Sequence, residues 1–550
     1  MIKILEKHKY LLSLILITIV ALSITYAHNI SLIVDCGREV YYPQEILNGK
    51  ILYRDLFNIY GPFAYLFNAL LYKIFSINLN VLCISGAFCA LGIIIGLYLT
   101  TRIFLKDKFA FSIGLLAITI GIIPCHIFNY AFPYAFAMTY GMCAFIFSLL
   151  FLVHYINSNK NIFLYFSLFL ASLAICCKYE FVLYLLVYIP VFINLKPKFY
   201  TILLGFLSFS LVPEICFGYL FIKGLSLKDL INTLNILKVM SQTETLKYFY
   251  VHSGIFFHIK ILPLLLKSFV ILFLPIFVYL IPVIFKKKVN NLIISSLFTY
   301  GAFCLMLLFK NNTTFELFTC LPIFLLLIFI FNFKKIINNL SIFVVITGIF
   351  LYSIKIFWGP LLNSYGVYYI PFLVLAVALC FKDKLTEKEW DYTGFYVSVL
   401  SFSIFLFQFN ALKLRNNLIS TEKGKIYTVK YYEKTNQLLN YIKNNTKKTD
   451  KIVVFPEGMM INFLSERKTD DFYNTLLPLY EETFGINTYI EYFKKDMPEY
   501  IIFNSWNSSD YYFSIICKDY GFAFCEFVVK NYEEKIKLLG AFSYVVYKRK

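Results

Sequence analysis

A short polar segment directly after the first apolar run holds residues whose types could do acid–base chemistry or bind a phosphate. It carries four carboxylates and two arginines, namely Asp35, Arg38, Glu39, Glu45, Arg54 and Asp55. Ionisable groups beside a membrane span are costly unless they are paired or used, so the cluster predicts a functional site. The alternative is a solvated loop in which the arginines and carboxylates only neutralise one another.

Charged side chains further along the chain are additional candidates for binding a phosphate. Lys178 and Glu180 lie at the predicted outer end of a helical hairpin, where both would be expensive if they faced lipid. Lys355 lies near Tyr365 and Tyr368, at the outer ends of two later spans. Each group has a simpler explanation: Lys178 and Glu180 could form a structural ion pair, and the Lys355 ammonium group could reach water along its apolar stem.

Other polar patterns favour structure over chemistry. His252 and His258 are six residues apart without a clear companion carboxylate, which is a weak pattern for a metal site, so a divalent ion is left open but not predicted. The segment 455–458, Phe-Pro-Glu-Gly, is typical of a tight turn after a strand, although it could also recognise an acceptor. The chain contains no phosphate-binding loop, dinucleotide fingerprint, zinc ribbon or Ser-His-Asp grouping, which disfavours activity driven by cytosolic nucleotides.

The composition indicates that most of the chain lies in a lipid bilayer. Charged residues make up only 15% of the chain and hydrophobic residues 59%, whereas a soluble domain has about 25% charged residues. Most of the net charge of +19 reflects the membrane topology of the chain. Lysines recur at alternate ends of apolar runs, at 106–108, 196–198, 286–288, 334–335 and 382–384. Such clusters mark cytoplasmic loops, so the basic charge does not indicate a nucleic-acid partner.

About thirteen apolar runs approach the ~20 residues that a spanning helix needs. The first follows Lys3, Lys7 and Lys9 and is interpreted as an uncleaved anchor, which places the N-terminus in the cytoplasm. An odd number of crossings places the C-terminal end outside, and the lysine clusters then all lie inside. The predicted spans are 10–27, 81–105, 109–128, 135–156, 162–177, 181–195, 199–220, 261–285, 291–309, 316–333, 342–357, 367–381 and 395–411.

The spans divide the chain into a polytopic α-helical membrane domain, 1–411, and a soluble α/β domain, 412–550. Two long loops face outward, 28–80 and 223–260, and segment 63–75 of the first is too short to cross, so it predicts a helix in the membrane interface. In the soluble domain, periodicity predicts a helix at 431–444, strands at 451–455, 500–503, 522–529 and 542–547, and a connector at 421–425. Cys517 and Cys525 fit a disulfide and free thiols equally well.

This layout and three short motifs resemble the GT-C glycosyltransferases, and among them the subgroup that contains the protein mannosyltransferases and the aminoarabinose transferase of lipid A. The resemblance covers the whole chain in layout, but in sequence it is specific only in the first loop. The motifs are an acidic residue soon after the first span, Asp35, then Gly49-x-x-x-Tyr53-Arg54-Asp55, and Tyr60-Gly61-Pro62.

The resemblance implies an enzyme that transfers a sugar from a polyprenyl-phosphate donor to a hydroxyl acceptor in the cell envelope, a lipid, glycan or protein. Asp35 matches the catalytic acid of the family and would be the base of an inverting displacement, with Glu39 or Asp55 as alternatives. Many relatives have a second acid where this chain has Cys36, which leaves Glu39 as a substitute. Substrate binding would involve Arg38, Arg54, Tyr60, Lys178, Glu180, Lys355 and Tyr365.

The implied location is the inner membrane of a bacterium, with the soluble domain in the periplasm. A transporter or flippase of a lipid-linked glycan is the alternative, although transporters tend to have repeated halves and charges near the bilayer midplane, which this chain does not clearly show. A noncatalytic scaffold whose soluble domain recruits partners is a third interpretation.

Overall fold

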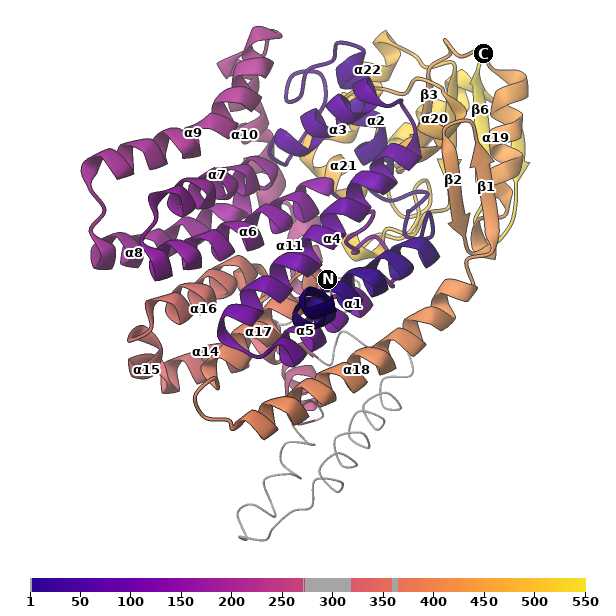
Figure 1. Ribbon diagram of the computed structural model, residues 1–550. Helices are drawn as coiled ribbons and strands as arrows, with labels where there is room; N and C mark the ends of the chain where they lie inside the picture. The colour runs from indigo at the N-terminus through magenta and orange to yellow at the C-terminus, as the bar shows by residue number, and fades with distance from the viewer. Residues whose placement is uncertain (1, 271, 273–317, 359–364) are drawn as a thin grey trace.

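The computed structural model describes residues 2–270, 272, 318–358 and 365–550, with side chains from His8 onward (Figure 1). The predicted span 291–309 and the lysine cluster 286–288 lie outside the described residues, as do most of span 261–285 and the start of span 316–333.

Four of the described helices are long and apolar enough to cross a membrane: α4 (Leu79–Phe104), α6 (Phe136–Ser158), α9 (Phe199–Ile222) and α18 (Glu387–Lys413). Eight shorter apolar helical segments accompany them, so the predicted count of about thirteen spans is not confirmed. The other helices of this part are α1 (Ile2–Ile24), α5 (Asp107–Gly121), α7 (Asn161–Cys177), α8 (Tyr188–Leu195), α14 (Leu321–Phe331), α15 (Phe333–Ile337), α16 (Leu340–Ser353) and α17 (Ile370–Cys380).

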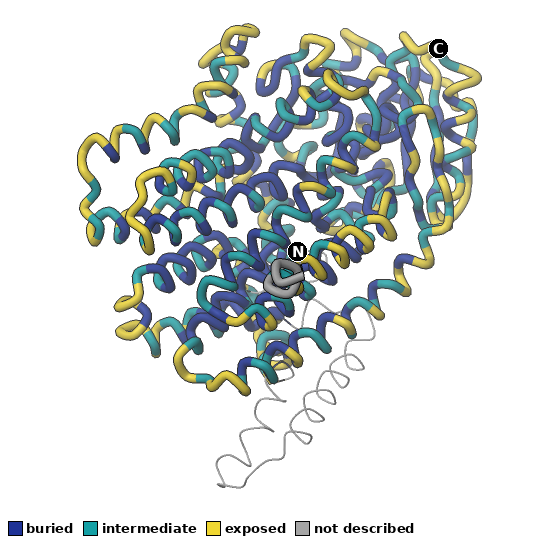
Figure 2. The backbone as a smooth tube through the Cα atoms, viewed as in Figure 1, coloured by how far each residue is buried: buried dark blue, intermediate teal, exposed yellow. Residues whose placement is uncertain are grey.

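Local signals in the sequence decide where these helices begin and end. α18 begins eight residues before the predicted span, because Thr386 and Glu389 form a capping box at its N-terminus. The predicted span 181–195 is wrong as a single α-helix: it is a 3-10 helix, η1 (Tyr179–Val187), followed by α8. Exposed apolar side chains follow the outer face of α9, where Phe199 is 80% and Ile222 is 86% exposed (Figure 2). A helix with such a face suits contact with lipid.

Both outer loops contain helices. The helix predicted at 63–75 is confirmed as α3 (Phe63–Ile74), while its place in the membrane interface stays a prediction, and α2 (Cys36–Leu47) precedes it. The second loop, for which no helix or strand was predicted, folds into α10 (Leu227–Gln242) and α11 (Glu244–His252). Side chains cap both of these helices at the N-terminus, Ser226 in a capping box with Asp229, and Thr243.

The C-terminal residues form a small α/β domain whose four-stranded sheet has the order β3-β4-β6-β5. β3 (Ile452–Phe455) and β4 (Tyr500–Asn504) are parallel, and β6 (Tyr544–Arg549) pairs antiparallel with β4 and with β5 (Tyr532–Leu538). The predicted connector 421–425 is wrong, because it lies in the hairpin β1 (Asn417–Thr421) and β2 (Gly424–Thr428). The helices are α19 (Lys434–Asn445), α20 (Met459–Ser465), α21 (Pro478–Phe484), α22 (Ile486–Lys495) and α23 (Phe522–Asn531).

The predicted strand 522–529 is also wrong, since these residues form α23. A short apolar run fits a strand or a buried helix, and periodicity does not separate the two. Gly521, with φ of +70°, begins this helix, and a disulfide joins Cys525 in its first turns to Cys517. The predicted helix 431–444 and the strands at 451–455 and 500–503 are confirmed.

The C-terminal domain packs directly on the first predicted outer loop, and in Figure 1 α2 lies beside α20. A Cβ atom added to Gly37 of α2 would lie 2.3 Å from the backbone nitrogen of Met460, so only glycine allows α2 to approach α20 this closely. The backbone N–H of Thr469 donates to the Tyr41 hydroxyl at 3.0 Å. The second outer loop joins the same contact, because α10 and α11 pack on α21.

Candidate active site

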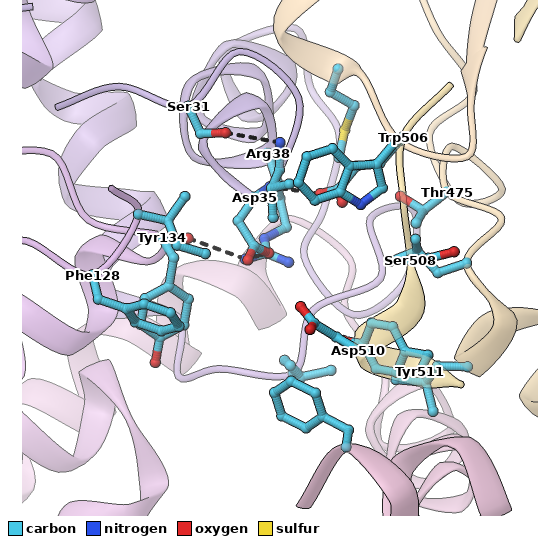
Figure 3. A pocket seen from close by; sticks show the side chains of 18 of the residues that line it. Ser31, Asp35, Arg38, Phe128, Tyr134, Thr475, Trp506, Ser508, Asp510 and Tyr511 are labelled. Carbon is cyan, nitrogen blue, oxygen red and sulfur yellow. Dashed lines mark hydrogen bonds and ion pairs between the residues drawn. The ribbon is translucent and has the colours of Figure 1, made fainter. Parts of the chain in front are cut away.

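A cavity of about 800 Å³ lies where the two outer loops, the ends of the membrane helices and the soluble domain meet. Figure 3 shows Asp35 and Arg38 on one side of it and Thr475, Trp506, Ser508, Asp510 and Tyr511 of the soluble domain on the other. Of the residues predicted from the sequence to take part in catalysis or substrate binding, six line this cavity: Asp35, Arg38, Tyr60, Lys178, Lys355 and Tyr365. Residues that are far apart in the sequence therefore surround one cavity that is large enough for a sugar.

Asp35 stands directly before the first turn of α2, with φ of +54°, a backbone conformation that is unusual for a residue with a side chain. Its carboxylate Oδ1 lies 3.0 Å from the guanidinium of Arg38, and its side chain remains 27% exposed toward the cavity. Burial raises the pKa of Asp35, and the charge of Arg38 opposes that rise. Asp35 is therefore a carboxylate with one cationic partner and access to the cavity.

Glu39 has a different environment, although it lies one helical turn from Asp35. Its side chain is fully buried, accepts hydrogen bonds from the Tyr65 hydroxyl at 2.6 Å and the Phe136 N–H at 2.8 Å, and lies 3.4 Å from Arg38. Phe136 is the first residue of α6, so the carboxylate satisfies a backbone donor at a helix N-terminus. Glu39 holds Arg38 and α6 in place and does not line the cavity.

Arg54 and Asp55 also lie away from the cavity, and they bind each other. Two hydrogen bonds of 2.9 Å join the guanidinium to the carboxylate, and Asp55 also accepts the N–H of Ile51 at 2.9 Å. Arg54 is 40% exposed. For Arg54 and Asp55, the structure therefore agrees with the alternative in which arginines and carboxylates of this loop only neutralise one another.

The Tyr60-Gly61-Pro62 motif places the first outer loop against the end of α7. The Gly61 N–H donates to the Cys177 carbonyl at 3.0 Å, and a Cβ atom on Gly61 would lie 2.0 Å from the Cys176 carbonyl oxygen. Any other residue would push the two segments apart, so this position requires glycine. The contact places Tyr60 beside Lys178, whose ammonium group lies 5.6 Å from the ring centroid.

Lys178, Glu180 and Lys355 form a buried charged triad at the cavity wall. Glu180 lies 3.1 Å from Lys178 Nζ and 3.3 Å from Lys355 Nζ, and Lys178 also donates to the Tyr134 hydroxyl at 2.8 Å. Lys355 does not reach for water along its stem: it is 24% exposed and lies 3.8 Å from the Tyr365 ring centroid. Two lysines share one carboxylate, so the triad carries a net positive charge whenever Lys178 is protonated.

Burial changes the acidity of Lys178. It lowers the pKa of the ammonium group to about 7, against the attraction of Glu180 and with the repulsion of Lys355. An anion placed in the cavity would favour the protonated form, so Lys178 is suited to bind a phosphate with uptake of a proton.

Sequence reasoning missed the cavity residues of the soluble domain. Glu457 follows β3 in the turn at 455–458, which was interpreted as mainly structural, and its carboxylate accepts the backbone N–H of Asp35 at 2.6 Å. Trp506 and Asp510 lie after β4 in a loop without a recognisable motif. Glu457 carried a detectable signal, a charged residue in a tight strand-to-helix turn, whereas Asp510 carried none. Across the described ranges, no group of three or more His, Cys, Asp or Glu side chains is arranged to hold a metal ion.

Comparisons with known proteins decide the fold. No protein-family model matches the chain, and no curated protein sequence matches it. Among solved structures, ArnT from Cupriavidus metallidurans, crystallised with undecaprenyl phosphate, matches with a TM-score of 0.52 over 98% of each chain, at 11% sequence identity. This chain has the ArnT fold. The predicted likeness to the GT-C glycosyltransferases and their aminoarabinose transferase subgroup is therefore confirmed at the level of the fold.

A second solved structure is the oligosaccharyltransferase AglB from Archaeoglobus fulgidus, determined with an inhibitory peptide and a dolichol-phosphate. It matches with a TM-score of 0.48 and 13% identity over 98% of this chain and 74% of that chain. In this chain the ArnT fold joins a helical bundle to an α/β domain, and the cavity lies between the two.

Proposed function

We propose that this protein is an integral-membrane glycosyltransferase, which transfers one sugar from a polyprenyl-phosphate carrier to a hydroxyl group of an acceptor in the cell envelope. The observation that carries the proposal is that a partly exposed carboxylate, Asp35, faces the same cavity as the cationic side chains of Arg38, Lys178 and Lys355. A base beside a cationic wall is what sugar transfer from a lipid phosphate requires.

The cations support a phosphate as the donor group. The triad of Lys178, Glu180 and Lys355 is net positive when Lys178 is protonated, and Arg38 lies over the Tyr60 ring on the same side of the cavity. The ArnT structure that shares this fold contains undecaprenyl phosphate, a lipid phosphate of the proposed kind. Isolated buried cations are costly, and an arriving phosphate would compensate that cost.

The proposed reaction is a single displacement. Asp35 accepts the proton of the acceptor hydroxyl, whose oxygen forms a bond to the anomeric carbon as the bond from that carbon to the phosphate oxygen breaks. The carrier leaves as a phosphate monoester with one more negative charge than it had in the donor. Lys178, Lys355 and Arg38 stabilise this charge, and attack from the opposite side inverts the anomeric configuration.

The proposed location is the outer face of a bacterial inner membrane, with the N-terminus in the cytoplasm. Both predicted outer loops pack on the soluble domain, so the three lie on one side of the membrane. The disulfide between Cys517 and Cys525 supports an oxidising compartment, because such bonds are rare in the cytosol. The periplasm meets both conditions.

Purified protein in lipid vesicles tests the proposal. With a polyprenyl-phosphate sugar and envelope extract as the acceptor source, we expect labelled sugar to enter an acceptor, and Asp35→Asn to reduce the rate by about 10²–10⁴-fold. Asp55→Asn is the matched control, since Asp55 is bound by Arg54 away from the cavity. Transfer that survives Asp35→Asn in folded protein would remove Asp35 from the mechanism. Translocation of the lipid without transfer would favour a flippase.

A further inference from the structure

Glu457 is a buried carboxyl group of the soluble domain that reaches the residue proposed as the base. Its side chain is 6% exposed, and its Oε1 atom accepts the backbone N–H of Asp35 at 2.6 Å. The turn that carries it is fixed on both sides: Asn504 donates to the Glu457 carbonyl at 2.7 Å, and a Cβ atom on Gly458 would lie 2.5 Å from Val454. The position of Glu457 relative to Asp35 is therefore set by the fold of the soluble domain.

Glu457 differs from Asp35 in having no cation of its own. Asp35 forms an ion pair with Arg38, whereas no ion pair within the described ranges involves Glu457. Burial and the nearby charge of Asp35 raise the pKa of Glu457 to about 8. Neighbouring carboxyl groups disfavour a second negative charge, so Asp35, which has the cation, is the first of the two to ionise, and Glu457 keeps its proton near neutral pH.

The other titratable groups around the pair do not take over this role. Arg38 stays protonated, and Glu39 is held by Arg38, Tyr65 and the N-terminus of α6. Burial raises the pKa of the remaining neighbours, which therefore stay neutral at neutral pH: Cys36, Tyr60, Tyr365, Tyr480 and Tyr511.

We propose that Glu457 is a positioning residue of the active site: it holds the Asp35 backbone in place and, by keeping its proton, leaves the Asp35 carboxylate as the single negative charge of the pair. The soluble domain then acts on the base itself as well as forming a wall of the cavity. This inference rests on the proposed role of Asp35 as the base, and it adds a residue that supports that role.

The pH profile of sugar transfer is the first test. Glu457→Gln keeps an oxygen that can accept the Asp35 N–H and cannot acquire a second negative charge, so the acid limb of kcat/KM should stay in place while the KM for the donor rises less above about pH 8 than in the wild type. The matched control is Glu481→Gln, because Glu481 is also a partly buried carboxyl of this domain, accepts the Gly521 N–H at 3.0 Å and lies outside the cavity. We expect its profile to coincide with that of the wild type.

A second test needs no enzymatic activity. The folded pKa of Glu457 is above its unfolded value, so its stabilising contribution is complete below about pH 4.5 and is lost as the pH rises to about 8. Glu457→Gln does not suffer this loss. Its thermal midpoint in detergent should therefore rise relative to the wild type between pH 5 and pH 8.5, and by less when Asp35→Asn has already removed the repulsion.

The outcomes separate the inference from the proposed function. A wild-type protein without transferase activity refutes the proposed function, while the thermal experiment still decides whether the two carboxyls are coupled. If the wild type is active and Glu457→Gln leaves the rise of the donor KM above about pH 8 unchanged, the inference is wrong and the proposed function stands. The inference is also wrong if Glu457→Gln changes the thermal midpoint equally in the wild-type protein and in the Asp35→Asn variant.

Discussion

The first outer loop holds two arginine–aspartate pairs of the same composition that have different environments. In the first pair, Asp35 receives one contact from Arg38, and its second carboxylate oxygen has no protein donor among the described residues. In the second pair, both oxygens of Asp55 are bound by Arg54, and one also accepts a backbone N–H. A carboxylate that is saturated by donors is a poor base, so the unsatisfied oxygen of Asp35, and not its residue type, marks it as the candidate.

Replacing the two arginines gives the largest expected difference between the pairs. Arg38→Met leaves Glu39 fully buried without its cation, so we expect a loss of about 3–5 kcal/mol in the free energy of unfolding. Arg54→Met removes a pair that is 40% exposed on the arginine side, and a loss of no more than about 1 kcal/mol is expected. Thermal unfolding in detergent measures both. Equal shifts would show that burial does not distinguish the pairs.

Two glycines of the same loop provide a second contrast. Gly61→Ala places a Cβ atom 2.0 Å from the Cys176 carbonyl oxygen, so we expect a loss of about 1–3 kcal/mol and weaker donor binding as Tyr60 moves from Lys178. Gly49→Ala meets no atom within 4 Å but has φ of +95°, so only a backbone cost of about 1–2 kcal/mol applies, with donor binding unchanged. Calorimetric titration with the donor separates them. Equal affinity in both variants would contradict a positioning role for Gly61.

Lys178 differs from both arginines in that its charge depends on pH near neutrality. Because Lys178 has a pKa of about 7 and must be protonated to bind a phosphate, the affinity for a singly charged isoprenyl phosphodiester should fall by up to about tenfold per pH unit above 7. Lys178→Arg stays protonated and should remove this dependence. Titrations from pH 6 to pH 9 test it. A wild-type affinity that does not change with pH would place the phosphate elsewhere.

The smallest expected effect concerns the exposed half of the loop. Lys50 forms an ion pair with Asp471 of the soluble domain, and both side chains are partly exposed. We expect Lys50→Met to lower the free energy of unfolding by only about 0.2–1 kcal/mol and to leave transfer unchanged. A large loss of transfer would mean that this edge of the loop also controls the cavity.

The sequence predicted the membrane-side half of the cavity well. Apolar periodicity located most described helices, the motifs singled out Asp35 and Tyr60, and their charges beside span ends singled out Arg38 and Lys178. These residues lie at the ends of spans, where a charge is rare and therefore informative. Arg54 and Asp55 were equally prominent in the sequence, yet they bind each other, because residue type and spacing do not reveal which donors already surround a carboxylate.

The soluble half was predicted less well. Glu457 lies more than 400 residues after Asp35, and nothing in a single sequence indicates that a turn after β3 meets the start of α2. The start of α10 could have been recognised, since Ser226 and Asp229 stand at capping-box spacing, but only a long loop between two spans was predicted there. The strand predicted at 522–529 failed because a short apolar run fits either structure.

The close approach of Gly37 to Met460 has a consequence for protein engineering. Chimeras are often made by exchanging a C-terminal domain at the last membrane helix, as if that domain were an interchangeable module. In this protein such an exchange would bring a foreign turn against a helix start shaped for another partner. A chimera that functions should carry residues 35–41 of the donor together with its residues 455–470, because the two segments fit only as a pair.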